Sequence, residues 1–512
     1  MMKEIINKLR RKKKLTALIL GALSVLALPP FFQFYILFIT FSGLFLLTEK
    51  SETAFKAFGV GYWFGFSFFA IGFSWVGNAL LIDAETMWWL YPIALFSAGI
   101  VFGFFTAIPA LIAYKFRNTY FKYMAFCSML VIFEWIRSFI LTGFPWNQFG
   151  SVLAFDIRLL QTASIFGTYG LSLFVILICS AMGLYLSERD AKSGITAAAV
   201  ILTITLGVLL YGNGRLQSNT FFDPSDIKVR LVQPSIAQEL KWDRQTLEEN
   251  LKSYIDMSKS PGLNNVDFVI WGETASPFPL DMDPNHLTMT AKAAPEKGYL
   301  VTGSLRYEYN ENDKTYRPAN SLFVINRDGD IEEYYDKHHL VPFGEFIPLK
   351  EYLPEWIKPI TKVVGDFIKG SGNKTFELDK YPSFGPLICY EIIFPSEIIN
   401  KKNKPHWLIN VTNDGWYGDS MGPRQHLVTT QLRAVEEGVA IVRVANTGIS
   451  AVISYTGEIL GSIPLGKKDI LDIYLPKKLS TPTLYGKFGN YLIVILFLAN
   501  IIMIFMCRKP KK

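Results

Sequence analysis

The sequence predicts two kinds of structure in one chain: a multi-pass α-helical membrane bundle of eight helices, and an α/β domain inserted before the last helix. Half of the 512 residues are hydrophobic and only 19% are charged. The mean hydropathy is positive, which is unusual for a soluble protein of this size. The charged residues are unevenly placed, and the chain is too long for one ordinary domain. We therefore expect a membrane part and a separate folded part.

Eight apolar runs predict the membrane helices. Most of them approach or exceed the roughly 20 residues that a spanning helix needs. The first run is short and follows a basic head, so a signal peptide is the alternative for it. The second run follows at once, which favours a helical hairpin that stays in the membrane. The runs lie at about 15–28, 31–47, 55–81, 89–114, 123–142, 165–187, 195–211 and 490–506.

The distribution of Lys and Arg predicts the orientation of these helices. If the basic N-terminus is cytoplasmic, every predicted inner loop carries basic residues, whereas the outer loop 82–87 has none and the outer loop 143–164 has only Arg158. Because cytoplasmic loops are enriched in Lys and Arg, both termini are expected in the cytoplasm. The basic residues of the inner loops are Lys50, Lys56, Lys115, Arg117, Lys122, Arg189 and Lys192.

These patterns divide the chain into three parts. Residues 1–212 form a membrane domain with about seven transmembrane helices, residues 213–485 an extracytoplasmic α/β domain, and residues 486–512 the last helix with a basic cytoplasmic tail. Turns with glycine at Asn326–Asp330 and Tyr455–Glu458 indicate hairpins. The strand candidates are Val229–Gln233, Asp267–Trp271, Tyr299–Gly303, Ser321–Asn326, Pro386–Tyr390, Trp407–Thr412 and Val439–Ala445, and Leu427–Gly438 is a helix candidate that ends at its glycine.

Three polar residues lie where short strand-like segments of the α/β domain finish. Glu273 follows DFVIWG, Lys337 follows IEEYYD, and Cys389 stands in PLICYE. Active residues of α/β sheets gather at the carboxyl ends of strands. Together these side chains supply a base, a cation and a soft nucleophile, and a thiol needs such neighbours to react at neutral pH. The sequence therefore indicates nucleophilic catalysis through Cys389.

Each of the three residues also has an ordinary structural interpretation. Glu273 could be a carboxylate at a helix N-terminus, because Thr274 and Ser276 suit a cap. Lys337 could be one more surface lysine in an acidic stretch, and Cys389 could be a buried, inert thiol. Only the combination favours the catalytic interpretation.

Longer motifs around these residues resemble known families. The strings WGE at 271–273, DKHHLVPFGE at 336–345 and CYE at 389–391 are similar to the nitrilase superfamily, also called the carbon-nitrogen hydrolase superfamily. Five longer strings resemble the apolipoprotein N-acyltransferase family, and this resemblance covers nearly the whole chain. They are QPSIAQELKWD at 233–243, HLVPFGEFIP at 339–348, ICYEIIFP at 388–395, TNDGWYGDSMGPRQH at 412–426 and RVANTGISAVI at 443–453.

The resemblance implies a nitrilase-like α-β-β-α sandwich with a Glu–Lys–Cys triad, here Glu273, Lys337 and Cys389. It also implies an acyltransferase of the bacterial inner membrane, with a periplasmic catalytic domain. Such an enzyme moves an acyl chain from a phospholipid to the N-terminal amine of a diacylglyceryl-lipoprotein, the last step of bacterial lipoprotein maturation. The expected route is ping-pong chemistry through a thioester on Cys389. We expect a monomer.

Four further residues match supporting positions of the family: Glu345, Tyr390, Glu391 and Trp242. Glu345 could hydrogen-bond Lys337 or assist the base, and a plain turn carboxylate is the alternative. Trp242 matches a family tryptophan near substrate, although a half-buried aromatic side chain would look the same in the sequence.

Two further features remain open in the sequence. The segment 351–371 is unusually apolar for a loop, which predicts a mobile lid in the outer leaflet or, alternatively, a pair of packed amphipathic helices. Glu134 and Arg137 lie three residues apart in the fifth helix and could pair while facing the bundle interior. The sequence does not decide whether they hold a lipid headgroup or only the structure.

The sequence lacks the motifs typical of metal, nucleotide or nucleic-acid binding. There is no HExxH, CxxC or P-loop motif, and the five histidines lack metal-ligand spacing, so we expect no metal and no cofactor. The net charge of +7 comes with no recognition motif, so no nucleic-acid partner is expected. The rival interpretations are a membrane-tethered amidase or nitrilase, a transporter with an outer domain, and a catalytically dead binding domain.

Overall fold

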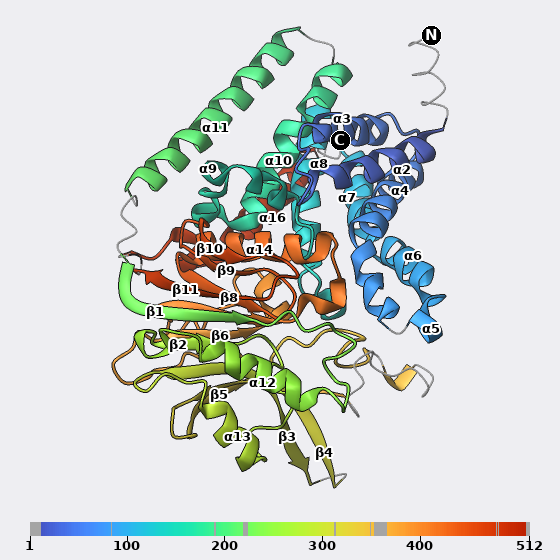
Figure 1. Ribbon diagram of the computed structural model, residues 1–512. Helices are drawn as coiled ribbons and strands as arrows, with labels where there is room; N and C mark the ends of the chain where they lie inside the picture. Colours follow the sequence, from blue (N-terminus) through green and yellow to red (C-terminus); the bar gives the residue numbers. More distant parts are fainter. Residues whose placement is uncertain are drawn as a thin grey trace. The chain divides into compact units, whose positions relative to one another are not determined.

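The computed structural model divides the chain into two compact units, Met1–Ser218 with Thr483–Lys512, and Asn219–Pro482 (Figure 1). It describes residues 12–507 apart from 83, 189–190, 219–223, 312–313, 349, 353–365, 478 and 480.

The first unit is helical, and each predicted apolar run lies on a helix of it. Helix α8, for example, covers most of the fifth run, and α16 covers the last. The helices are α2 (Lys13–Ser24), α3 (Ile36–Glu49), α4 (Ala54–Gly72), α5 (Ala84–Met87), α6 (Leu90–Phe102), α7 (Phe104–Tyr114), α8 (Thr119–Ile136), α9 (Ile157–Leu160), α10 (Ala163–Glu188), α11 (Ala191–Ser218), α15 (Leu484–Phe488) and α16 (Tyr491–Cys507).

Four helical stretches in the described residues are long and apolar enough to cross a membrane. Two shorter apolar helices, Ile36–Glu49 and Tyr491–Met506, accompany them. This supports a helical membrane part, while the number of eight spans stays a prediction. The four stretches are Ala54–Gly72, Glu85–Tyr114, Ala163–Ser187 and Ala198–Ser218.

Small residues let these helices approach closely. At Gly61 of α4, an added Cβ would lie 2.5 Å from the carbonyl oxygen of Thr106 and 2.8 Å from the Cα of Ala107, both on α7. The Thr106 hydroxyl also donates a 2.7 Å hydrogen bond to the Gly61 carbonyl oxygen. Membrane helices associate through such small-residue contacts because lipid offers no hydrophobic driving force between them.

Glu134 and Arg137 are both buried in the helical unit, where they bind the backbone after α8. The Glu134 carboxylate accepts a 2.7 Å hydrogen bond from the Phe149 N–H. Nη1 of Arg137 donates 2.6 Å bonds to the carbonyl oxygens of Phe144 and Trp146. Buried polar groups in a membrane need such partners, so these two side chains hold the non-helical segment that follows α8.

The second unit contains two β-sheets. The six-stranded sheet has the order β11-β1-β2-β3-β4-β5, and the five-stranded sheet has the order β10-β9-β8-β7-β6. Its elements are β1 (Pro224–Gln233), α12 (Leu247–Ser258), β2 (Phe268–Ile270), α13 (Pro284–Ala291), β3 (Tyr299–Asn310), β4 (Thr315–Ile325), β5 (Ile331–Asp336), β6 (Phe384–Ile388), β7 (Trp407–Thr412), α14 (Met421–Glu437), β8 (Ala440–Ala445), β9 (Ser450–Ile453), β10 (Ile459–Ile463) and β11 (Asp469–Pro476).

Alternating side chains organise these sheets into an α-β-β-α sandwich. Phe268 and Ile270 of β2 face the core between the two sheets, whereas Val269 belongs to a second core beneath helix α12. Successive side chains of a strand point to opposite faces, so a strand covered on both sides is apolar throughout. Helices α12 and α13 cover the six-stranded sheet and α14 covers the other (Figure 1).

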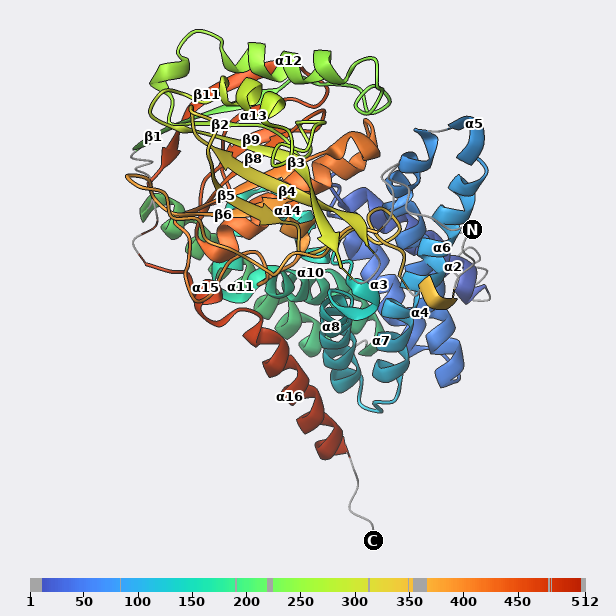
Figure 2. The ribbon, with the colours of Figure 1, turned by 90° about the horizontal axis from the view of Figure 1, so that it is seen from below.

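The predicted strands all appear. The Trp407–Thr412 candidate matches β7 at both ends, and the other candidates differ from the observed strands at one or both ends. The Pro386–Tyr390 candidate was wrong at its end, because β6 stops at Ile388 and a 3₁₀ turn begins at Cys389. Both predicted hairpins are present as antiparallel pairs, β4 with β5 and β9 with β10. The longest hairpin joins β3 and β4 (Figure 2).

Helix α14 begins at Met421, six residues before the predicted start at 427. The hydroxyl of Ser420 caps it by accepting a hydrogen bond from the Gly422 N–H. Gly422 and Pro423 look like loop residues in the sequence, but Pro is accepted in the first turn of a helix. Gly438 ends the helix as predicted, in a left-handed conformation (φ 69°).

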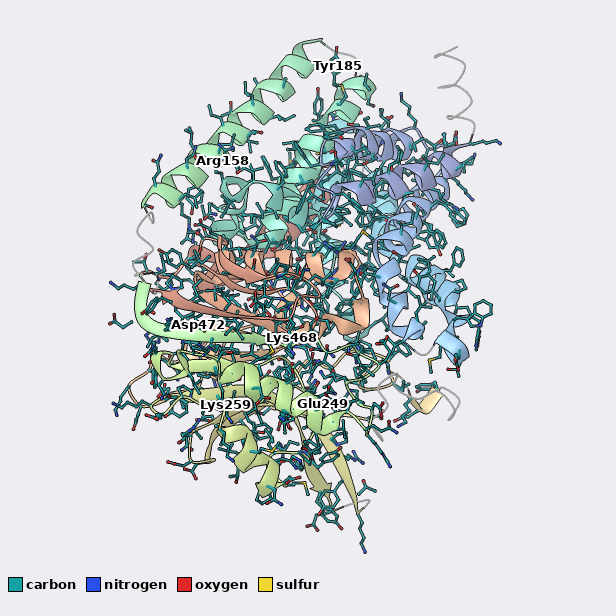
Figure 3. The ribbon with its side chains drawn as sticks, viewed as in Figure 1. Arg158, Tyr185, Glu249, Lys259, Lys468 and Asp472 are labelled. Carbon is teal, nitrogen blue, oxygen red and sulfur yellow. The ribbon has the colours of Figure 1, made fainter. Side chains whose placement is uncertain are left out.

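A buried arginine connects three elements of the sandwich. Arg230 on β1 forms two hydrogen bonds, of 2.7 and 2.8 Å, with the carboxylate of Asp472 on β11, which Figure 3 labels. Its guanidinium also donates to the carbonyl oxygens of Ser258, the last residue of α12, and of Ser260 and Pro261 in the loop that follows. A planar guanidinium suits such multiple, directed contacts.

We predict that Arg230→Met destabilises the protein by about 3 kcal/mol, because it leaves three carbonyl groups and a carboxylate without their donor. The thermal midpoint of the full-length protein in detergent should fall by roughly 6–12 °C. Lys228→Met is the control, since the side chain of Lys228 lies over the ring of Tyr474 and its hydrogen bonds with Asp267 come from its backbone. Equal midpoints for both variants would contradict this role.

Candidate active site

Glu273, Lys337 and Cys389 each follow the end of a strand, namely β2, β5 and β6. All three are at most 7% exposed. Glu273 does not begin a helix, because the next helix starts at Pro284, and Lys337 is not a surface residue. The ordinary interpretations of these two side chains were therefore wrong.

Lys337 lies between two carboxylates. Its Nζ is 3.3 Å from Oε1 of Glu273 and 2.9 Å from Oε1 of Glu345. The side-chain amide of Asn320 donates to the same two oxygens, at 2.8 and 2.9 Å. The second oxygen of Glu345 accepts a 2.8 Å bond from the Val341 N–H. One ammonium and one amide thus hold two buried carboxylates in place.

The charges of this cluster stabilise one another. Burial alone would lower the pKa of Lys337, but Glu345, Glu273 and Cys389 raise it well above its usual value. Burial alone would raise the pKa of Glu273, but the ammonium groups of Lys337 and Lys241 lower it, with hydrogen bonds from Asn320 and Cys389. Glu273 is therefore a carboxylate and Lys337 an ammonium at neutral pH.

Cys389 occupies an unusual backbone conformation beside this cluster. Its φ is +49°, which costs about 1–2 kcal/mol for a residue with a Cβ. Burial and the Glu273 carboxylate raise the pKa of its thiol to about 12, while Lys337 and a hydrogen bond from Thr412 oppose the shift. The resting thiol is therefore protonated, and a reaction must remove the proton as the sulfur attacks.

Glu391 stabilises the backbone on both sides of the cluster. One of its oxygens accepts hydrogen bonds from the Tyr335 hydroxyl at 2.6 Å and from the N–H groups of His338 and His339 at 2.7 and 3.2 Å. The other accepts a 2.7 Å bond from the Ile388 N–H. The carboxylate thus connects the residue after Lys337 to the residue before Cys389.

A second buried network holds the carbonyl oxygen of Cys389. Nε2 of His426 lies 3.3 Å from this oxygen and Nδ2 of Asn410 lies 3.4 Å from it. Arg443 contacts Asn410, His426 and Asp414 at 2.7–3.0 Å. Burial and Arg443 lower the pKa of His426, while the Asp414 carboxylate opposes the shift. Nδ1 of the ring lies 3.0 Å from both Oδ1 of Asp414 and a guanidinium nitrogen of Arg443. The strained turn is therefore held by side chains from β7, β8 and α14.

The remaining residues and the lid that the sequence predicted for the site differ in how far the structure describes them. Tyr390 is buried, with its ring edge-on to Phe394 at 5.1 Å. Trp242 is half-buried in the loop between β1 and α12. Most of the predicted lid 351–371 lies outside the described residues. Among the described side chains, no group of three His, Cys, Asp or Glu could hold a metal ion.

Some residues of the site escaped the sequence analysis. Asn320 lies inside β4 rather than after a strand. A search for polar residues at the carboxyl ends of strands therefore did not find it. Asp414, His426 and Arg443 are fully buried. Asp414 and His426 stand in the polar stretch between β7 and β8, which could have suggested a buried site, whereas Arg443 lies within β8. Lys241 stands in a polar segment that looks like solvent-exposed loop.

Family models match both parts of the chain. The carbon-nitrogen hydrolase model matches residues 228–482, which assigns the sandwich to that class of domain. The model of the apolipoprotein N-acyltransferase N-terminal domain matches residues 20–181.

Relatives extend this likeness over the whole chain. An apolipoprotein N-acyltransferase of Rhodopseudomonas palustris is 36% identical over 98% of this chain and 96% of its own length. An apolipoprotein N-acyltransferase from Rickettsia typhi is 36% identical over 94% of this chain and 96% of its own length. One from Brucella melitensis is 34% identical over 91% of this chain and 90% of its own length. The chain belongs to the apolipoprotein N-acyltransferase family.

We predict that Glu391→Gln loosens the site. The amide group of the new side chain would place its N–H donors against the N–H and O–H groups that now donate to the carboxylate. The lost hydrogen bonds should lower the free energy of unfolding by about 2–3 kcal/mol. The buried thiol of Cys389 should then react severalfold faster with iodoacetamide, measured by intact mass at pH 8. Glu377→Gln is the control, because Glu377 is exposed and accepts one bond from Asn403. Unchanged stability and alkylation in Glu391→Gln would contradict the role of this carboxylate.

Proposed function

We propose that this protein transfers a fatty acyl chain from a phospholipid to the N-terminal amine of a diacylglyceryl-cysteine on apolipoproteins, through a thioester on Cys389. The printed names of its relatives support the acyltransferase class. One observation carries the mechanism: a buried cysteine in a strained turn lies within the electrostatic reach of a carboxylate and an ammonium.

In the first half-reaction, the Glu273 carboxylate accepts the thiol proton while the sulfur attacks the ester carbonyl carbon of the phospholipid. The carbonyl oxygen becomes an oxyanion, which the Lys337 ammonium stabilises. Among the described residues, Lys337 donates to two carboxylates, which leaves one of its three protons for this oxygen. Collapse breaks the ester C–O bond, and the protonated Glu273 gives its proton to the leaving alkoxide.

In the second half-reaction, the lipoprotein amine attacks the thioester carbonyl carbon. Glu273 takes a proton from this nitrogen, the C–S bond breaks, and the proton returns to the sulfur. The products are an amide and the free enzyme. Both half-reactions therefore use the same base and the same oxyanion site, and the covalent intermediate between them leads to ping-pong kinetics.

The remaining family positions take supporting roles in this proposal. The Glu345 carboxylate accepts a hydrogen bond from Lys337 and stabilises its positive charge. Glu391 positions the backbone around the triad. Tyr390 and Trp242 would contact substrate, and the apolar segment 351–371 would act as a lid toward the lipid.

We also propose the placement of the protein in its membrane. Eight helices cross the bacterial inner membrane, about seven of them within residues 1–212 and the last within 486–512. Residues 213–485 then form the catalytic domain on the periplasmic side, with both termini in the cytoplasm. The basic residues of the predicted inner loops support this orientation. We expect the protein to act as a monomer.

A membrane-tethered amidase or nitrilase would use the same cluster with water as the second acceptor. The apolar helices and the family of the relatives favour lipid substrates over that alternative.

The test is intact-mass spectrometry of the purified full-length protein after incubation with phospholipid. We expect a fatty-acyl mass increment on the wild type that hydroxylamine removes and that a diacylglyceryl-peptide acceptor discharges as an N-acylated peptide. Cys389→Ser should show no hydroxylamine-sensitive adduct, because an oxygen ester would form slowly and would resist this reagent.

Cys179→Ser serves as the control for the loss of a thiol, since Cys179 is buried in the helical unit, and it should keep the adduct. No adduct on the wild type would overturn the thioester route. An adduct that water discharges as fast as the peptide acceptor would support the hydrolase alternative.

A further inference from the structure

A second buried lysine lies beside the base. Lys241 is 5% exposed, and its Nζ donates hydrogen bonds of 2.8 Å to the carbonyl oxygen of Glu273 and 2.7 Å to the hydroxyl of Thr274. Among the residues that the structure describes, no carboxylate oxygen lies within 4.0 Å of this Nζ. A lysine is rarely buried without an ion pair. Burying this ammonium costs folding free energy that ordinary packing does not explain.

The backbone that Lys241 contacts is itself strained. Thr274 has a φ of +45°, an outlier for a β-branched residue. On the other side of this turn, a Cβ at Gly303 of β3 would lie 2.9 Å from the Cα of Glu273. The turn is therefore confined between β3 and the Lys241 ammonium, and its conformation determines where the Glu273 carboxylate points.

The loop that carries Lys241 is anchored on the same side of the domain. Asn446 binds both the N–H and the carbonyl oxygen of Ile236, at 3.0 and 2.8 Å. The side chain of Asn413 donates a 2.9 Å bond to Gln238. These contacts tie the loop to the residues that directly follow β7 and β8, the strands that carry Asn410 and Arg443. The loop of Lys241 is thus anchored to the five-stranded sheet.

Lys241 also acts on the charges of the site. Burial lowers its pKa to about 8, while Glu273 and Cys389 oppose this shift. Its ammonium in turn helps to keep the pKa of Glu273 below the usual value. The charged and titratable groups around the Glu273 carboxylate are Lys337, Lys241, Glu345, Cys389 and Tyr417.

We propose that Lys241 is a positioning residue for the general base: it holds the strained Glu273–Thr274 turn and places a second positive charge behind the carboxylate. This inference rests on the proposed function, since it assigns Glu273 the proton transfer. Lys241 itself touches no reacting atom in this proposal.

The test measures the rate of thioester formation on Cys389 of the full-length protein against pH and phospholipid concentration. Lys241→Met should slow this step roughly 10- to 100-fold, with a change of less than about twofold in the phospholipid concentration for half-maximal rate, because the residue acts on the base rather than on lipid binding. Glu273 must be ionised to act, and loss of the nearby cation raises its pKa. The acidic limb of the rate profile should therefore move to higher pH.

Two further variants separate the geometric effect from the charge. Thr274→Val removes one hydrogen bond of Lys241 but keeps the charge, so the rate should fall roughly 3- to 10-fold with the acidic limb unmoved. Lys374→Met is the matched control, because the Lys374 side chain contacts the carbonyl group and ring of Tyr334, on the outer strand β5, and it should behave as wild type.

The outcomes distinguish this inference from the proposed function. Without an adduct on the wild type, the thioester route itself fails. With an adduct on the wild type, a Lys241→Met profile like that of Lys374→Met overturns the positioning role, as does a slower rate with an unmoved acidic limb. If Lys241→Met does not fold, as judged by thermal unfolding and gel filtration, Thr274→Val decides: a wild-type rate overturns the inference, and the expected loss supports it.

Discussion

The site depends on the balance of buried charge around Lys337. Two carboxylates removed from water would repel each other and take up a proton, unless a cation lies between them. Lys337 supplies that cation, and Asn320 supplies the neutral donor that completes the coordination of both oxygens. The arrangement keeps Glu273 ionised inside a protein core and keeps a positive charge beside it, which are the conditions that the proposed base and the proposed oxyanion site need.

The two sheets make this balance possible. Glu273 and Lys337 come from the ends of strands in the six-stranded sheet, whereas Cys389 comes from the end of β6 in the other. The apolar core between the sheets excludes water from the space where they meet, which strengthens every electrostatic interaction there. Two of the non-glycine residues with positive φ, Thr274 and Cys389, lie in short turns at the site. Each is held by side chains from several elements, as expected where a backbone outlier serves a site.

Much of this architecture could be read from the sequence, for identifiable reasons. Strands buried on both faces leave continuous apolar runs, so their positions were clear, and the polar residue after each run marked the candidate triad. Asn320 and Arg443 could not be found this way, because each is a polar residue within a strand. Lys241 lies in a polar loop, and only tertiary packing buries it. The end of β6 was missed by two residues, since the hydrophobicity of Ile388 and Cys389 does not reveal that the chain turns between them.

The raised pKa of the Cys389 thiol has a consequence for the lifetime of the protein. Peroxides and disulfides react with thiolates far faster than with thiols. A cysteine that stays protonated at rest is therefore spared sulfenic acid formation and mixed disulfides, even in oxidising surroundings. In the proposed thioester route, burial would thus preserve the Cys389 thiol between turnovers, and the thiol would react only when a substrate carbonyl can accept its electron pair.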